Sequence, residues 1–270
     1  MIFWHRYVLV IPLIMLICMG NSTASTLTTV TIQSNNTNQV NNSDRALLQS
    51  STTGNFEEVK YHLKQGANPD ATAQDRNRRS ALIIAAAGGY TDIIEALLVN
   101  GAQIDYRDSA GLTALNWSVL RSRNEVTKYL LSKHADANIS DNRDITPVMY
   151  AVGTSNTKTL KLLKSNGAAL DAKSKASKMT PLLIAIENGD HEMVLTLLKL
   201  GARVNNTNHD EHTPLMSATE SGNIDIVNTL ISYGADTTLK NLKGMTALAL
   251  ARKNGFKKIE EILTALGKTD

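Results

Sequence analysis

Cysteine is almost absent from this sequence. The single cysteine, Cys18, lies in an N-terminal segment that we expect to be removed, so the mature chain would hold none. A chain without cysteine has no disulfide framework, although an exported protein would permit one. It also has no thiol to act as a nucleophile. The fold must therefore be stable without covalent cross-links.

The sequence also lacks an excess of one charge. Its 28 Lys and Arg residues nearly balance its 25 Asp and Glu residues, which gives a formal net charge of +3. A nucleic-acid-binding domain gathers its basic residues on one face. The basic residues here are not gathered in that way, so we expect no nucleic-acid partner.

Patterns for catalysis and metal binding are missing as well. The sequence has no Gly-rich phosphate loop. Its one ligand-like cluster is His209-Asp210-Glu211-His212, and four consecutive loop residues mostly diverge rather than converge on a metal. The other histidines of the mature chain suggest no Ser-His-Asp arrangement: His62, His134 and His191. We expect no enzyme activity, no cofactor and no metal.

The apolar run near the N-terminus is short. Tyr7–Met19 follows a cationic start and is shorter than the roughly 20 residues that span a bilayer, but it is typical of a signal-peptide core. Small residues at Ser22 and Ala24 predict cleavage after Ala24, so residues 1–24 are expected to be a signal peptide. The alternative is an uncleaved inner-membrane anchor. Membrane contact is expected only through this segment.

Residues 25–43 are polar, uncharged and rich in Asn, Thr and Ser. Such a segment buries too little apolar surface to offset the entropy lost on ordering. We therefore expect a flexible tether that leads into a folded domain at residues 44–270.

The stretch from Met179 to Asn205 has the pattern of one complete structural unit. Thr180 is a favourable N-cap and Pro181 suits the first helical position. A short apolar helix follows and ends at Gly189. A second helix with one apolar stripe then ends at Gly201, where a positive φ angle is favourable for glycine. Neither helix can bury its apolar face alone.

This unit recurs along the chain. The Ser and Thr capping positions are spaced by 33, 33, 34, 33 and 33 residues: Ser80, Thr113, Thr146, Thr180, Thr213 and Thr246. A degenerate copy precedes them and begins near Arg45. The fragments "TPLLIA", "TPLMSA", "TALNWS" and "TALALA" repeat in phase with ends similar to "LLxxGA".

On this period and these fragments, the sequence resembles the ankyrin repeat family over residues 44–270. The resemblance implies an all-α ankyrin-repeat solenoid of about seven helix-turn-helix repeats with extended loop fingers. Two copies depart from the pattern, because Ser122 and Ser155 replace the glycine between the helices and His134 replaces the glycine at a repeat end. A non-Gly residue at positive φ costs free energy, so these copies are expected to be locally weaker.

Two loops are longer than the period requires, and both are basic. The loop before Ser80 has two extra residues and carries Arg76, Arg78 and Arg79. The loop before Thr180 has one extra residue and carries three lysines: Lys173, Lys175 and Lys178. One interpretation is a pair of basic fingers that meet an acidic partner. The other is ordinary solvated loop charge.

Trp117 and Tyr150 lie four residues after the caps of adjacent repeats, so they should be neighbours. Two large aromatics on a binding face would form a hot spot. Bulky residues at this position also fill the core between repeats, and both interpretations stay open. Leu112, Ile145 and Met179 are apolar at a position that the family pattern leaves variable and exposed.

The resemblance also implies the residues that contact a protein partner, at the loop tips and on the inner helix face. With the aromatic pair, the expected contacts are Arg76, Asn77, Arg79, Arg107, Leu112, Trp117, Arg121, Arg143, Ile145, Tyr150, Met179, Glu187, His209, His212 and Glu220.

Exported bacterial ankyrin proteins that resemble this one include immunity proteins against antibacterial effectors such as secreted phospholipases. The resemblance therefore implies a non-catalytic periplasmic protein, monomeric before complex formation, that neutralises such an effector. Other similar proteins are periplasmic accessory factors for oxidative-stress defence, associated with catalase, and this alternative stays open. A glycan at the Asn116 sequon would fall inside a helix, which favours the bacterial periplasm over a eukaryotic secretory route.

Overall fold

The computed structural model describes residues 42–266. Within them lie fourteen α-helices and no β-strand, with one isolated antiparallel bridge between Thr72 and Ser80. The all-α architecture expected from the sequence is confirmed. The predicted signal peptide (residues 1–24) and residues 25–41 of the predicted tether lie outside the described residues. Among the helices that are described, none combines the length and the apolar character needed to cross a bilayer.

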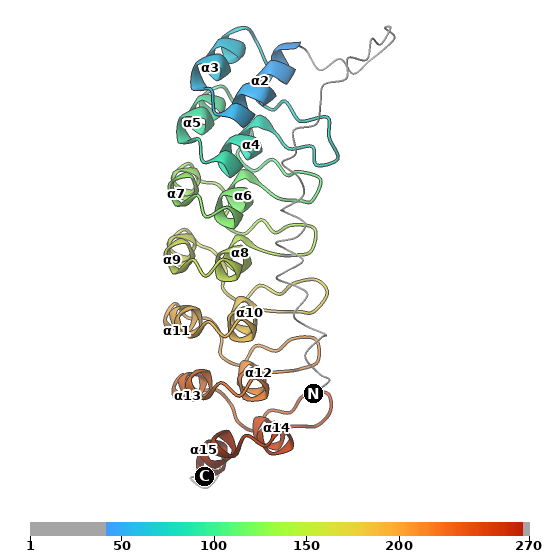
Figure 1. The fold of residues 1–270 in the computed structure, drawn as a ribbon, viewed down its shortest axis with the longest axis vertical. Helices are drawn as coiled ribbons and strands as arrows, with labels where there is room; N and C mark the ends of the chain where they lie inside the picture. Colours follow the sequence, from blue (N-terminus) through green and yellow to red (C-terminus); the bar gives the residue numbers. More distant parts are fainter. Residues whose placement is uncertain (1–41, 267–270) are drawn as a thin grey trace. The chain divides into compact units, whose positions relative to one another are not determined.

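The described helices form seven helix-turn-helix pairs stacked in two columns (Figure 1). The inner column holds α2 (Asn42–Thr53), α4 (Ala81–Gly88), α6 (Ala114–Leu120), α8 (Pro147–Gly153), α10 (Pro181–Glu187), α12 (Pro214–Glu220) and α14 (Ala247–Asn254). The outer column holds α3 (Phe56–Lys64), α5 (Thr91–Val99), α7 (Asn124–Ser132), α9 (Thr157–Ser165), α11 (His191–Lys199), α13 (Ile224–Ser232) and α15 (Lys257–Leu266). Each helix packs against its own partner, and each inner helix also packs against the inner helices of the adjacent pairs.

The inner helices from α4 onward begin at the capping residues that the sequence period identifies. In each, the hydroxyl of the cap accepts a hydrogen bond from the backbone N–H three residues later, at 3.2–3.3 Å. Pro147, Pro181 and Pro214 then occupy the first helical turn, where a missing N–H has no cost. The caps therefore fix the start of each repeat.

The first described helix begins earlier than the sequence analysis expected. Helix α2 starts at Asn42, so Asn42 and Ser43, which were assigned to the tether, are helical. Asp44 lies in the first turn of α2, where a negative charge is favourable beside the exposed N–H groups. Asp44 also accepts a hydrogen bond from the backbone N–H of Asn68 at 2.7 Å.

The three residues that replace repeat glycines do adopt left-handed backbone conformations. Their φ angles are 53° at Ser122, 64° at His134 and 51° at Ser155. The copies beginning at Thr113 and Thr146 therefore keep the turn geometry without glycine. A buried hydrogen bond of 2.8 Å between the hydroxyls of Ser118 and Thr127 joins the two helices of the first of these copies.

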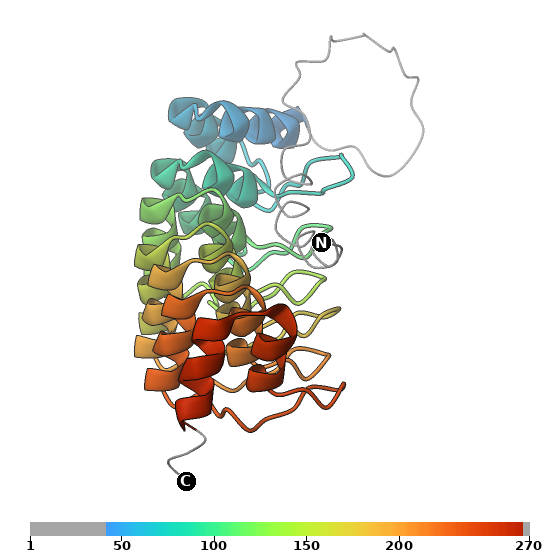
Figure 2. The same ribbon diagram turned by 60° about the horizontal axis from the view of Figure 1, so that its bottom comes forward.

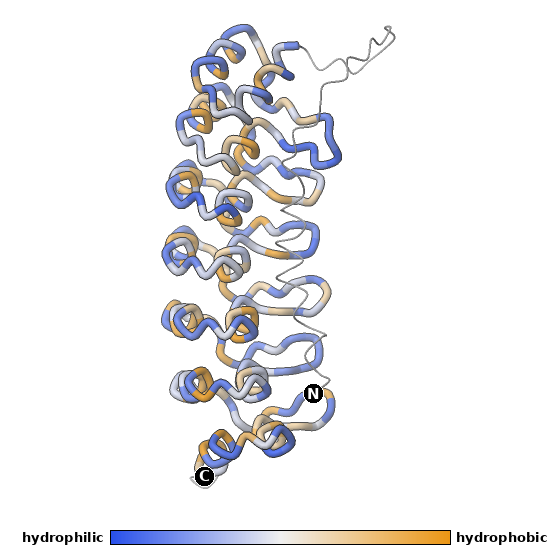
Figure 3. The backbone as a smooth tube through the Cα atoms, viewed as in Figure 1, coloured by the Kyte–Doolittle hydropathy of each residue, from blue (hydrophilic) through white to orange (hydrophobic). Residues whose placement is uncertain are grey.

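The core lies between the two columns and between successive pairs. Each pair contributes fully buried aliphatic side chains, such as Leu82 and Leu97 in one copy and Leu182 and Leu197 in another. In Figure 3 the apolar colouring follows the helices, while the loops on the other side of the inner column are mainly polar.

Those loops are the fingers, which all project from the same side of the inner column (Figure 2). We number them 1 to 6 in chain order, at residues 70–79, 105–112, 138–145, 171–179, 205–212 and 238–245. Fingers 1 and 4 are the long ones.

A side-chain oxygen closes each finger. In finger 2, Oδ1 of Asp108 accepts hydrogen bonds from the backbone N–H groups of Ala110 and Leu112, both at 2.9 Å. The same pattern, with donors two and four residues on, occurs with Asp141, Asn208 and Asn241. In finger 1, Asp75 accepts from the N–H groups of Asn77 and Arg78, two and three residues on. In the longer finger 4, Oγ of Ser174 accepts from the N–H of Met179. These bonds satisfy backbone donors that a tight loop would otherwise leave unpaired.

Successive fingers are joined by backbone hydrogen bonds of 2.9–3.1 Å, one at each junction. The donor–acceptor pairs are Ser109–Asn77, Asn142–Ala110, Lys175–Arg143, His209–Ser177 and Leu242–Asp210. A second row joins the bases of the fingers, where Asp70, Asp105, Asn138, Asp171 and Asn205 accept from the backbone N–H of the following repeat. The six fingers therefore form one connected surface.

We expect Asp108→Ala to lower the free energy of unfolding by about 3 kcal/mol, because it leaves two finger N–H groups and the Nε1–H of Trp117 without their acceptor. Asp108→Asn is the matched control. It keeps an oxygen for the finger, as Asn208 and Asn241 do, and should cost about 1 kcal/mol. Urea denaturation followed by circular dichroism measures both. Equal losses for the two variants would contradict this account of finger closure.

Candidate interaction surface

The residues expected to contact a partner divide into three groups by exposure. Exposed on the fingers and the inner helix ends are Arg76, Asn77, Arg107, Arg121, Arg143, Glu187, His209 and Glu220. Partly exposed are Arg79 and His212. Buried are Leu112, Trp117, Ile145, Tyr150 and Met179. The fold brings several of them into direct contact across repeats.

Trp117 makes cation–π contacts with two arginines. Its ring centroid is 5.7 Å from the guanidinium carbon of Arg79, on finger 1, and 5.7 Å from that of Arg121, at the end of α6. Its Nε1–H donates to Oδ2 of Asp108 at 2.9 Å. Only 8% of Trp117 is exposed. Its burial favours the core interpretation, although one of the two guanidiniums beside it lies on finger 1 and the other at the end of α6.

Tyr150 occupies the same position in the next repeat and is also buried. Its hydroxyl donates to Oδ2 of Asp141 at 2.8 Å, and Arg143 binds the same carboxylate through Nε and Nη2 at 2.9 and 2.7 Å. Burial, together with the negative charge of Asp141, raises the pKa of the Tyr150 hydroxyl. Tyr150 therefore stays neutral and serves as a hydrogen-bond donor inside the finger.

Leu112, Ile145 and Met179 differ from the expectation of an exposed position. They are 5%, 4% and 2% exposed. Each directly precedes the cap of an inner helix, and its backbone N–H is bound by the side chain that closes the finger. The side chains therefore point under the fingers rather than toward solvent. Sequence reasoning missed this because the finger folds back over its own last residue.

A second polar group lies further along the same face. Nε2 of His212 is 3.1 Å from Oε2 of Glu220. Nδ1 of His212 is 3.2 Å from the amide Nδ2 of Asn241. The oxygen of that amide accepts from the backbone N–H groups of Lys243 and Met245, so its NH₂ group faces His212. In the neutral imidazole, Nδ1 of His212 is therefore the acceptor and Nε2 carries the proton, but Nε2 is not aligned for a hydrogen bond to Glu220.

The two glutamates of this group are shifted in opposite directions. Partial removal of its carboxylate from water raises the pKa of Glu187 to about 7, although part of the side chain is exposed, and attraction to the protonated form of His212 acts against this rise. The close contact with His212 lowers the pKa of Glu220, and the charges of Lys253 and Lys243 add to this effect.

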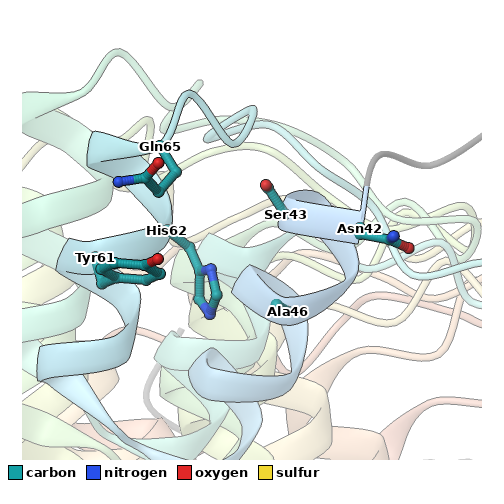
Figure 4. A pocket seen from close by; sticks show the side chains of 6 residues that line it. All are labelled: Asn42, Ser43, Ala46, Tyr61, His62 and Gln65. Carbon is teal, nitrogen blue, oxygen red and sulfur yellow. The ribbon is translucent and has the colours of Figure 1, made fainter.

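The described residues contain no group of three or more His, Cys, Asp or Glu side chains placed to hold a metal ion. In the cluster at residues 209–212, His209 pairs with Asp210 at 3.3 Å, whereas His212 turns toward Glu220. A hollow of about 430 Å³ between α2 and α3 is lined by Asn42, Ser43, Ala46, Tyr61, His62 and Gln65 (Figure 4). None of the expected contact residues lines it.

Sequence reasoning missed the residues that hold this surface in place. Asp108, Asp141 and Asn241 bind both a finger backbone and a side chain of the surface. The available signal was an Asp or Asn five residues before most of the Ser and Thr caps. That signal identifies the position, but the bonds to Trp117 and Tyr150 depend on the folded finger.

Comparison with known proteins gives one consistent family. The model described as "Ankyrin repeats (3 copies)" matches residues 13–108, 46–141, 115–208 and 201–269. Similar curated proteins include the ankyrin repeat and KH domain-containing protein mask-1 of Caenorhabditis elegans, 31% identical over 158 residues. Human Rabankyrin-5 is 30% identical over 157 residues. Each match covers 57% of this chain, but only 6% and 13% of those longer proteins.

Solved structures agree with the fold. The ankyrin repeat domain of Bcl-3 matches with a TM-score of 0.74 and 28% identity, over 81% of this chain and 97% of that one. The ankyrin repeat domain of human ASB11 matches with a TM-score of 0.66 and 27% identity, over 80% and 96%.

The opposite pKa shifts predict opposite effects of two substitutions. The raised pKa of Glu187 means that its carboxyl contributes stability below the ordinary value of 4.5, which is lost as the pH rises through about 7. Glu187→Gln should therefore gain melting temperature relative to the parent protein as the pH rises across this range. The lowered pKa of Glu220 means that its contribution is present above 4.5 and is lost as the pH falls below that value.

Glu220→Gln should accordingly lower the melting temperature at neutral pH, with a difference that shrinks in acid. Thermal melts of the parent and both variants across this pH range test the pair. Differences that run in the same direction for the two variants would refute the assignment.

Proposed function

Because the chain belongs to the ankyrin repeat family, whose repeats generally mediate binding between proteins, we propose that its fingers and inner helix ends bind a protein partner without catalysing a reaction. The observation that carries this proposal is the row of exposed Arg, His and Glu side chains on fingers that hydrogen bonds connect into one surface. A partner that spans several fingers meets a preformed set of contacts, which lowers the entropy cost of association.

The composition of the surface also suits protein recognition. Arginine is favoured at protein interfaces because its planar guanidinium bonds carboxylates in pairs while its stem packs on apolar surface. Arg76, Arg79, Arg121 and Arg143 are distributed over fingers 1 and 3 and the end of α6. The opposite face of the array, formed by the outer helices, exposes Val99 and Tyr61 at separate sites.

Site-specific photo-crosslinking tests which face is used. A photoreactive phenylalanine placed at Arg76 or Asn142, both exposed on fingers, should crosslink to a partner protein in cells. The same group at Val99, which is 80% exposed on the outer helix α5, is the matched control and should not. Crosslinks from Val99 alone, or from none of the three positions, would contradict the proposal.

A finer part of the proposal concerns location and partner. We propose that the chain is exported to the periplasm and there neutralises a toxic effector, such as a lipase, by covering its active-site mouth. The support is the signal-peptide pattern at residues 1–24 and the absence of a catalytic pattern in the sequence. A long connected binding surface suits a stoichiometric inhibitor.

We expect the mature protein in a periplasmic extract to begin near Ser25, as measured by amino-terminal sequencing. Full-length chain found only in the cytosol would refute export. Deletion of the gene should sensitise cells to the effector encoded beside it. Sensitivity to peroxide alone would refute the inhibitor role and favour oxidative-stress defence.

A further inference from the structure

The arginines of the interaction surface differ in how far the protein itself satisfies them. Arg143 binds Asp141 through two nitrogens and also contacts the hydroxyl of Tyr150. Arg107 donates to the carbonyl of Gly111 at 3.1 Å and to the carbonyl of Ser140 at 2.9 Å, which ties finger 2 to finger 3. The guanidiniums of Arg107 and Arg143 therefore serve to hold the fingers in place.

Arg79 is not satisfied in this way. Its closest carboxylate is Asp75, with Nη2 at 3.7 Å from Oδ2, which is longer than a hydrogen bond. Its Nε is buried and has no hydrogen-bond partner among the described residues. A guanidinium has five N–H donors, and a buried donor without an acceptor costs free energy. The side chain as a whole is 31% exposed, so an oxygen acceptor from another molecule can approach the guanidinium from solvent.

The Trp117 ring, which Arg79 contacts, is held in place by hydrogen bonds. Trp117 is held by its bond to Asp108, and Asp108 is itself held by two backbone N–H groups of finger 2. The guanidiniums of Arg79 and Arg121 lie at the same distance from this one ring. In the cation–π contact between Arg79 and this ring, the N–H groups at the edge of the Arg79 guanidinium can still meet an acceptor.

The charges around Arg79 and Trp117 favour the binding of an anion. The neighbouring inner helices, α4 (ALIIAAAG) and α6 (ALNWSVL), contain no acidic residue. Asp75 already accepts two backbone bonds within finger 1, and Asp108 is buried. Arg76 and Arg78 add two exposed positive charges to the same finger.

We propose that Arg79 and Arg121, which both make cation–π contacts with Trp117, receive a carboxylate from a short acidic segment of the partner, with Arg76 and Arg78 on finger 1 flanking it. This inference rests on the proposed function, because it assigns the chemistry of the partner at one end of the same surface. The planar fork of a guanidinium matches the two oxygens of a carboxylate.

The acidic segment is short because exposed carboxylates interrupt the positive charge between finger 1 and the three exposed lysines of finger 4. Finger 3 exposes Asp144, finger 5 exposes Glu211, and the ends of α10 and α12 expose Glu187 and Glu220. A nucleic-acid backbone, which is negative along its whole length, would meet these carboxylates as it followed the surface. An acidic stretch of protein can end after finger 2.

The test uses a fluorescein-labelled octa-glutamate peptide as the probe and the octa-glutamine peptide as its comparison. Fluorescence anisotropy with the full chain at low salt should show affinity for the glutamate peptide about tenfold higher. The double variant Arg79→Gln/Arg121→Gln should lose about tenfold for the glutamate peptide alone. The matched control Arg203→Gln/Lys128→Gln removes the same charge elsewhere and should stay within about twofold of the parent.

A local readout comes from Trp117. In a Trp4→Phe background Trp117 is the remaining tryptophan, since the chain has two. Its emission should change as the glutamate peptide binds and should not respond to the glutamine peptide. If the double glutamine variant is unfolded by circular dichroism, Arg79→Lys is used instead. It keeps the charge but loses paired bonding, and should weaken binding by about threefold or more.

The inference is overturned if both peptides bind equally, or if a folded Arg79 variant binds the glutamate peptide as the parent does. It is also overturned if single-stranded DNA binds more tightly than the glutamate peptide. These results leave the proposed function standing wherever the finger positions still crosslink to a partner. Loss of those crosslinks refutes the proposed function itself.

Discussion

The closure of each finger by a single side-chain oxygen is the interaction on which the surface depends. Asp75, Asp108, Asp141, Asn208 and Asn241 each accept two backbone N–H groups of their own finger. Without that acceptor the backbone N–H groups of the finger would hydrogen-bond to water instead, and the loop would lose its single conformation. Fixed fingers place their backbones in register, so that one hydrogen bond can form at every junction.

The repeat architecture could be predicted from the sequence because it is a local and periodic property. A Ser or Thr cap, a short apolar helix, a turn and a second amphipathic helix recur every 33 or 34 residues, and each signal acts within a few residues of its effect. The left-handed turns at Ser122, His134 and Ser155 followed from the same alignment. The early start of α2 did not, since the first copy has no Thr or Ser cap in phase.

The surface was only partly predictable, because its decisive contacts join residues that the fold brings together. The resemblance to the ankyrin family implied that Arg79 and Arg121 belong to the contact surface, but it could not show that Asp108 binds the indole N–H of Trp117 between them. It placed Leu112 and Ile145 at the finger ends, but their burial depends on the finger folding over them. Burial and hydrogen-bond partners are tertiary properties, and a one-dimensional pattern reports only the position.

The single backbone bond at each finger junction has a mechanical consequence. Elements linked in series add their compliances, so a row of fingers joined only by a few hydrogen bonds at each junction bends more easily as the number of junctions grows. These bonds link each finger to its immediate neighbours, so a displacement of finger 2 acts first on fingers 1 and 3. The finger surface therefore keeps a fixed spacing between neighbouring fingers, while its curvature along the array can change.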